Sequence, residues 1–160
     1  MKRARVGIIA AAIVAVATVA FAQKPDFSGT WTLDPEASGA PAGGGGGGGG
    51  RGGGALGNGP AVVKQTADTL TIERTMGDNK VTATYKLDGS ESKNTMMGRG
   101  GNSVESVSTA KWDGPSLVIT TKMDMGNGPQ ESTQKWTVNG STLTIETTNA
   151  RGTQKMTYKK

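Results

Sequence analysis

Short runs of alternating apolar and polar residues, separated by turn-forming residues, recur along the chain from Ala61 onward. One such turn, Asp113–Ser116, carries a glycine and a proline between two runs. Pairing outward from this turn places Trp112 opposite Leu117. The next pair on the same face is Ala110 with Ile119, so apolar side chains meet across the hairpin. Because a one-residue slip would move a whole strand's side chains to the other face, the register is strongly specified.

Two other turn pairs have the same relation to their flanking residues. Asn-Gly is a strong signal for the tight turn of a β-hairpin, and Asp-Asn is also typical of turns. Outward pairing from Asp78-Asn79 and from Asn139-Gly140 predicts these opposed residues: Met76 with Val81, Ile72 with Tyr85, Leu70 with Leu87, and Trp136 with Leu143. Consecutive hairpins of this kind predict an antiparallel meander.

The same alternation predicts the positions of nine strands. They are expected within Asp26–Leu33 and near Ala61–Thr66, Thr69–Met76, Lys80–Leu87, Val104–Trp112, Leu117–Asp124, Glu131–Val138, Thr142–Thr148 and Thr153–Lys159. An open sheet of this length would expose two long unpaired edges. Pairing the first strand with the last removes both edges. We therefore predict an all-β protein, an antiparallel up-and-down meander barrel of eight to ten strands.

Residues 1–22 have the three parts of a secretory signal peptide. The start is positive, the middle is apolar, and the end has small residues at both positions that a signal peptidase reads: Lys2, Arg3 and Arg5, then Val6–Val19, then Ala20-Phe21-Ala22. An uncleaved anchor helix is the alternative, but it would not require the Ala-x-Ala ending. Cleavage before Gln23 is favoured. It predicts an exported protein of the periplasm or the extracellular space, with no membrane attachment after cleavage.

A glycine tract, residues 39–60, divides the expected mature chain. It includes eight consecutive glycines at Gly43–Gly50. Glycine loses the most backbone entropy on ordering and has no side chain to bury, so the tract is expected to be disordered. The predicted organisation is an N-terminal strand in residues 23–38, this linker, and a barrel domain in residues 61–160.

Charge and composition exclude several classes of function. The formal net charge is +5, of which the signal peptide carries +3, so a mature charge of +2 gives little support for nucleic-acid binding. The chain has neither cysteine nor histidine, which removes thiolate chemistry, the usual general base and the commonest metal ligand. No catalytic constellation remains. We expect a non-enzymatic protein without a cofactor.

The segment Gly29-Thr30-Trp31 resembles the first strand of the lipocalin and calycin superfamily, which carries a Gly-x-Trp signature. Its context is similar to that of small secreted bacterial lipocalin-like proteins. The resemblance implies that Trp31 closes the base of a barrel and packs against a basic residue beyond the last strand. Lys159 and Lys160 are the candidates for that residue. Gly29 and Trp31 are thus expected to be structural.

Polar residues share the expected inner face with large apolar ones. Extending the hairpin registers places the following candidates inside the barrel: Arg74, Tyr85, Ser106, Ser108, Thr121, Gln134 and Trp136. Such a mixed lining suits a cavity for one small lipophilic or amphipathic molecule. The alternative is that these residues form a solvated rim. The leading hypothesis is a ligand-binding barrel.

Methionines beside turns offer a second kind of site. Thioethers are soft ligands that select Cu(I), and the candidates are Met96, Met97, Met123 and Met125. Methionine also fills irregular gaps where aliphatic residues are few. Without histidine or cysteine, the packing interpretation is favoured, and no metal site is predicted.

The alternative function is a protein-interaction or inhibitor-type module. In that case the barrel is a scaffold, and the glycine tract in residues 39–60 is a tether or a contact segment for a protein partner.

Overall fold

A computed structural model describes residues 24–38, 56–57, 59–76, 79–97, 103–124, 126 and 128–160. The predicted signal peptide and most of the glycine tract lie outside these residues. At the end of the tract, Leu56 is buried, with 1% of its surface exposed. The packed part of the chain therefore reaches back beyond the expected domain boundary at Ala61.

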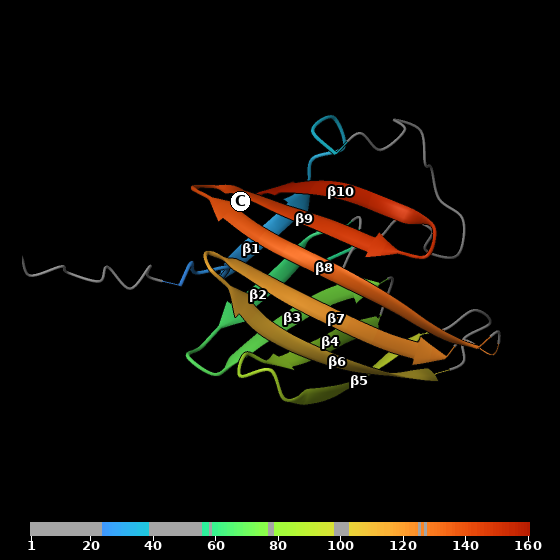
Figure 1. Ribbon diagram of the computed structural model, residues 1–160. Coiled ribbons are helices and arrows are strands. Elements are labelled where there is room, and N and C mark those ends of the chain that lie inside the picture. The colour runs from blue at the N-terminus through green and yellow to red at the C-terminus, as the bar shows by residue number, and fades with distance from the viewer. Residues whose placement is uncertain are drawn as a thin grey trace, which may run out of the picture.

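The described chain forms ten antiparallel strands, in agreement with the all-β prediction (Figure 1). The strands are β1 Gly29–Leu33, β2 Ala61–Gln65, β3 Thr69–Met76, β4 Asn79–Lys86, β5 Glu91–Met97, β6 Ser103–Asp113, β7 Ser116–Asp124, β8 Pro129–Asn139, β9 Thr142–Asn149 and β10 Gly152–Lys159. Strand β5 was not expected. Its inward residues are Ser92 and Asn94, so it lacks the apolar alternation that marks the other strands.

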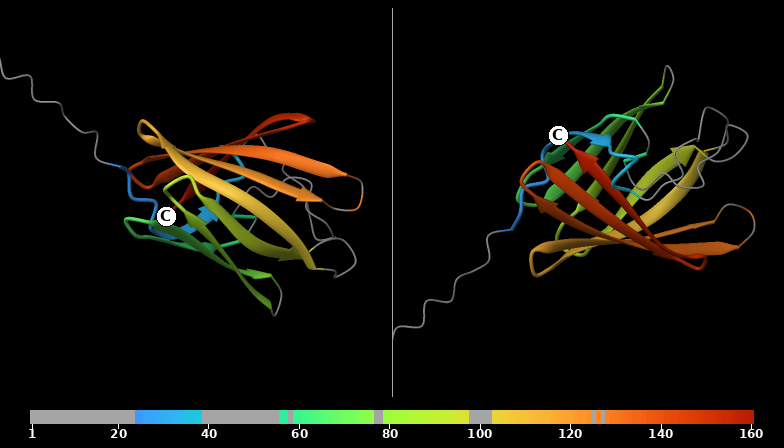
Figure 2. Two further views of the ribbon diagram at one scale, coloured as in Figure 1. Left: turned by 60° about the horizontal axis from the view of Figure 1, so that its bottom comes forward. Right: turned by 90° about the horizontal axis from the view of Figure 1, so that it is seen from above.

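The strands follow the order β4-β3-β2-β1-β10-β9-β8-β7-β6-β5 and curl into a nearly closed up-and-down barrel. In Figure 2, β1–β4 (blue to green) lie on one side and β5–β10 on the other. Strand β1 joins the two sides. Its first half, including Trp31, pairs with β2, and its last two residues pair with β10 through Thr32–Lys159 and Leu33–Tyr158. The predicted pairing of the first strand with the last is confirmed.

One of the three hairpin registers is as predicted, and two are wrong by two residues. Trp112 pairs with Leu117 and Ala110 with Ile119, as expected. The observed pairs in the other hairpins are Ile72 with Ala83, Leu70 with Tyr85, Arg74 with Val81, and Trp136 with Ile145.

A shift of two residues keeps every side chain on its predicted face, so the alternation could not distinguish the two registers. In the β8–β9 hairpin the shift adds the pair Asn139–Thr142. Gly140, whose φ is +59°, then occupies a turn position that favours glycine.

The apolar core fills one end of the barrel, which we call the base. The base holds the β6–β7 and β8–β9 turns, at the left in Figure 1. Phe27 stacks on Trp112 with ring centroids 5.9 Å apart and meets Trp136 edge-on at 5.8 Å. Trp31 is fully buried, and its Nε1 donates a hydrogen bond to the carbonyl oxygen of Phe27 at 2.8 Å.

Lys160 is the basic residue that packs against Trp31. Its Nζ lies 5.2 Å from the centroid of the indole ring, a cation–π arrangement. The Lys160 side chain crosses Gly29, whose φ is +145°, and occupies the space that a Cβ would need there. Lys159 instead pairs with Asp34, with Nζ 2.6 Å from Oδ2. Gly29 and Trp31 thus both contact Lys160, and Trp31 lies in the apolar core.

Replacing Trp31 by alanine should destabilise the whole barrel, because β1 joins both sides and Trp31 is fully buried. We expect a cost of about 3–5 kcal/mol, a large part of the roughly 5–15 kcal/mol typical of small domains. Thermal unfolding followed by circular dichroism should show an early or non-cooperative transition. The half-buried Trp112, replaced by alanine, is the matched control and should keep a cooperative transition. An unchanged melting temperature for Trp31→Ala would contradict this account.

Candidate ligand site

The structure places all seven predicted lining residues on the inner face of the barrel. Each lies at one of the alternate, inward positions of its strand, whereas its sequence neighbours point outward. Four of them are buried: Ser106, Ser108, Thr121 and Trp136. Arg74, Tyr85 and Gln134 are half-buried. The seven residues differ, however, in what their side chains contact.

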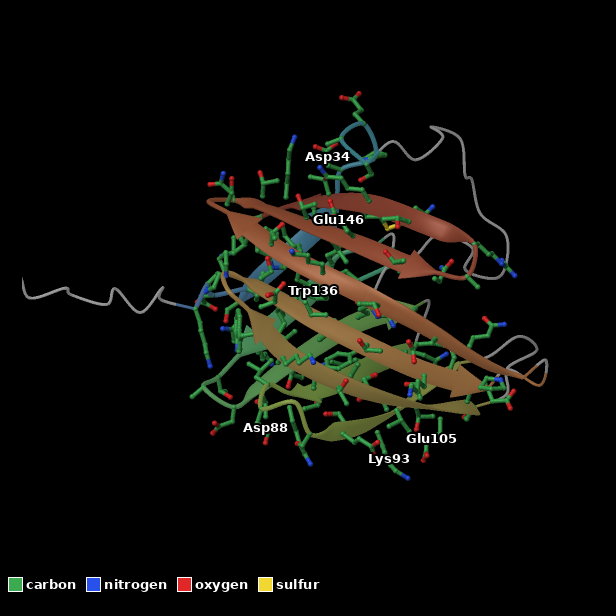
Figure 3. All side chains as sticks on the ribbon, in the orientation of Figure 1. Asp34, Asp88, Lys93, Glu105, Trp136 and Glu146 are labelled. Atoms are coloured by element: carbon green, nitrogen blue, oxygen red, sulfur yellow. The ribbon has the colours of Figure 1, made fainter. Side chains whose placement is uncertain are left out.

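Trp136 belongs to the aromatic cluster at the base. Figure 3 labels it near the middle of the molecule, on β8. Its Nε1 donates to Oε1 of Gln134 at 3.1 Å. These two predicted lining residues therefore satisfy one another, and Trp136 packs in the core.

The inward hydroxyl groups of β6 and β7 form a small internal network. Ser108 Oγ lies 2.8 Å from Oγ1 of Thr121, and Ser106 Oγ donates to the carbonyl oxygen of Asn94 at 3.1 Å. A hydroxyl that makes one bond keeps further capacity as an acceptor. This part of the inner face is thus polar, hydrogen-bonded and able to tolerate a polar ligand atom.

Arg74 introduces a positive charge among apolar neighbours. Its partners in the ladders are Ala61 on β2 and Val81 on β4, both of which are small or medium in size. A Cβ added at Gly57 would lie 3.4 Å from Nη1 of Arg74, so the guanidinium lies close to that backbone. In the part of the chain that the structure describes, no carboxylate oxygen lies within 4.0 Å of Arg74.

Two tyrosines lie within the electrostatic reach of Arg74. Burial raises the pKa of Tyr158 to about 12, and the charge of Arg74 opposes that rise. Burial also raises the pKa of Tyr85, again against the effect of Arg74. The Tyr158 hydroxyl donates to the carbonyl oxygen of Gly57 at 3.3 Å. Arg74, Tyr85 and Tyr158 thus form one cluster, which we call the arginine–tyrosine cluster.

Sequence reasoning missed Tyr158 as a site residue, although its strand was predicted. In β10, the buried residues Met156 and Tyr158 pair with the core residues Ile145 and Leu143. Extending the register of the β8–β9 hairpin onto the last strand would have placed Tyr158 inside. Tyr158 on β10 and Arg74 on β3 are brought near each other only by the folding of the barrel, so their closeness has no signal in the sequence.

The described residues give no support to a metal centre. They contain no group of three or more aspartates, glutamates, cysteines or histidines that could hold a metal ion. Of the candidate thioether ligands, only Met123 has a described side chain, and it is half-buried on β7. The side chains of Met96 and Met97 and the residue Met125 lie outside the described part.

A shallow groove of about 180 Å³ lies on the outer face of β5–β8. It is lined by outward side chains, including Val107, Thr109, Lys111 and Lys122. Nζ of Lys122 lies 3.5 Å from a carboxylate oxygen of Glu131, so part of its charge is already paired. The groove is separate from the arginine–tyrosine cluster.

Among the described residues, no helix is long and apolar enough to span a bilayer.

Comparisons with known proteins give similarity at the level of structure. No protein-family model and no curated protein matches the chain. The REP1-NXSQ fatty acid transporter is similar with a TM-score of 0.49 and 16% identity, covering 63% of this chain and 68% of its own. Fatty-acid-binding protein 1 of Echinococcus granulosus gives 0.48 and 16%, covering 63% and 70%. Secretory abundant heat soluble protein 4 of Ramazzottius varieornatus gives 0.49 and 20%, covering 83% and 93%.

The indole of Trp112 should be replaceable by phenylalanine at little cost. Its Nε1 is buried without a hydrogen-bond partner among the described residues. An unmet buried donor costs about 1–3 kcal/mol, and the substitution removes it while keeping the ring stack. The matched variant Trp136→Phe removes a donor that is bonded to Gln134 and should be clearly less stable. Urea unfolding of both variants measures the difference, and equal losses would contradict the assignment.

The stability of the barrel should fall in alkali because of Tyr158. Its pKa of about 12 lies above the ordinary value of 10.0, so the folded chain holds the phenol proton more tightly than the unfolded chain does. This stabilisation is fully present below pH 10 and is lost as the pH rises from about 10 to 12. In this range Tyr158 makes the free energy of unfolding fall more steeply with pH, by up to about 1.4 kcal/mol per pH unit, which corresponds to one proton. Tyr158→Phe should flatten the slope in urea unfolding; an unchanged slope would contradict this cause.

Proposed function

We propose that this protein is a non-catalytic carrier whose barrel binds one small amphipathic molecule with an anionic head group. The head group lies against Arg74, and the apolar part extends along the inner face. The guanidinium of Arg74, to which no described residue supplies a carboxylate, is the observation that carries the proposal. The proposal also includes export through the predicted signal peptide in residues 1–22, which would place the carrier in the periplasm or the extracellular space.

A cation inside a barrel, with no carboxylate partner among the described residues, requires a physical reason. Removing a charge from water is costly unless an opposite charge or several hydrogen bonds compensate for it. Arg74 is half-buried, and the described residues supply no carboxylate to it. A carboxylate ligand would supply two parallel hydrogen bonds to the planar guanidinium. Tyr85 and Tyr158 add phenol groups on the same cluster, and each is a donor as well as an acceptor.

The surroundings of Arg74 suit the apolar part of such a molecule. Ala61 on β2 pairs directly with Arg74, and Ala83 on β4 pairs with Ile72, the next inward residue of β3. Ile119 on β7 and Met156 on β10 belong to the same buried apolar core as Ile72. A ligand that combines an anionic group with an aliphatic or aromatic body therefore matches both the charge and the lining.

The direct experiment is native mass spectrometry of the protein purified from its own host. A co-purifying small anionic amphiphile is the expected result. A protein that is found only in the apo form, and that also fails to bind palmitate added in vitro, would overturn the proposal.

The substitution Arg74→Gln separates two contributions to affinity: the contact of Arg74 with the anionic head group, and the burial of the ligand's apolar tail. We expect the Kd for palmitate to rise by about tenfold or more, because hydrogen bonds to charged groups contribute roughly 1.5–3 kcal/mol and 1.4 kcal/mol is tenfold. Affinity for hexadecanol, which has the same tail without a charge, should change by only about twofold. Displacement of a fluorescent fatty acid measures both ligands.

The control for this prediction is Arg151→Gln. Arg151 is exposed in the β9–β10 turn, and its loss changes the net charge by the same amount. It should leave both affinities unchanged. Equal effects of the two substitutions on palmitate would mean that net charge alone attracts the ligand, and would contradict a specific role for Arg74.

A further inference from the structure

Strands β4 and β5 follow one another in the chain, yet they are not paired by a backbone ladder. They stand at the two ends of the strand order, so the barrel closes between them. We call this boundary the seam. In the described part of the chain no ion pair crosses it: Lys80 on β4 pairs back to β3, and Lys93 on β5 pairs with Glu105 on β6. Figure 3 shows Lys93 and Glu105 together at the β5 side of the barrel.

Two buried polar side chains of β5 bridge the seam. Oδ1 of Asn94 accepts a hydrogen bond from the backbone N–H of Thr84 at 2.8 Å, and Nδ2 of Asn94 donates to the carbonyl oxygen of Thr84 at 3.0 Å. Oγ of Ser92 accepts from the N–H of Lys86 at 2.8 Å. The amide of Asn94 thus bonds to β4 in the way that the peptide group of a neighbouring strand would.

One end of the seam is fixed, and the fixed end lies at the β4–β5 turn. The N–H of Leu87 donates to the carbonyl oxygen of Asp68 at 2.8 Å, and the N–H of Gly89 donates to that of Ala110 at 2.9 Å. The side chain of Leu87 is buried, with 5% of its surface exposed. Strand separation would therefore begin at the other end of the seam, beyond the Asn94–Thr84 pair.

We infer that the seam is the gate through which the ligand enters and leaves the barrel. The inference rests on the proposed function. Opening the seam breaks bonds made by two side chains, which can rotate away, whereas opening any other boundary breaks a backbone ladder. The gate also lies one strand from the anchoring charge, because Val81 on β4 pairs directly with Arg74 on β3.

Amide hydrogen exchange tests the opening of the seam without any ligand. Asn94→Ala should speed exchange of the Thr84 N–H by about tenfold or more, the change that corresponds to about 1.4 kcal/mol. Ser92→Ala should do the same at Lys86. Amides in the β7–β8 ladder should keep their rates in both variants. Unchanged exchange at Thr84 and Lys86, or equal acceleration in the ladder, would overturn the inference.

Cross-linking tests the gate with Asn94 and Ser92 in place. The chain has no cysteine, so a thiol-reactive linker acts only where cysteines are introduced. Thr84→Cys with Lys93→Cys places two exposed thiols on the two strands of the seam. The matched control, Lys122→Cys with Glu131→Cys, links an exposed pair within the β7–β8 ladder.

Bridging the seam after loading with palmitate should slow palmitate exchange by about tenfold or more. The control bridge should leave the exchange rate unchanged. Equal rates for the two bridged proteins would overturn the gate. Absence of any palmitate binding would refute the proposed function instead. The amide exchange of Thr84 and Lys86 would then still test whether the seam opens.

Discussion

The barrel depends on one strand of five residues that must pair with both of its sides. Strand β1 bonds to β2 through its first half and to β10 through its last two residues. Without it, β2 and β10 would each present an unpaired edge. The strand is held in place by a stack in which Lys160 crosses Gly29 to lie over the ring of Trp31. The strand that closes the barrel therefore also carries Trp31, which is fully buried.

Much of the fold could be predicted from the sequence, because period-two alternation specifies faces. This alternation predicted the register of the β6–β7 hairpin correctly, including the pair of Trp112 with Leu117. Alternation could not distinguish two registers that differ by two residues, because both put every side chain on the same face. Trp136 was therefore predicted opposite Leu143, whereas it lies opposite Ile145. Alternation also missed β5, whose inward side chains are polar because they bond across the seam. The sequence-based predictions therefore failed in two situations. In two hairpins the alternation left two registers possible, and in β5 side-chain hydrogen bonds take the place of apolar contacts.

The candidate site could be predicted in part for the same reason. Arg74 and Tyr85 share the inner face in any register of the correct parity, so their placement was accessible. The contact of Tyr158 with the Gly57 backbone joins segments 101 residues apart and had no local signal. The structure also shows a division of the interior that composition cannot give. Aromatic residues fill the base, and the arginine–tyrosine cluster lies among smaller side chains.

The period-two alternation of a strand decides which face each residue lies on, and every register of the same parity keeps that face. Ile72 pairs with Ala83 and Trp136 pairs with Ile145, and the side chains of Ile72 and Trp136 are both buried. A designed shift of two residues in either hairpin would change these partners and would leave both side chains facing inward. The length of a hairpin arm, changed in steps of two residues, is therefore a design variable separate from the composition of the interior.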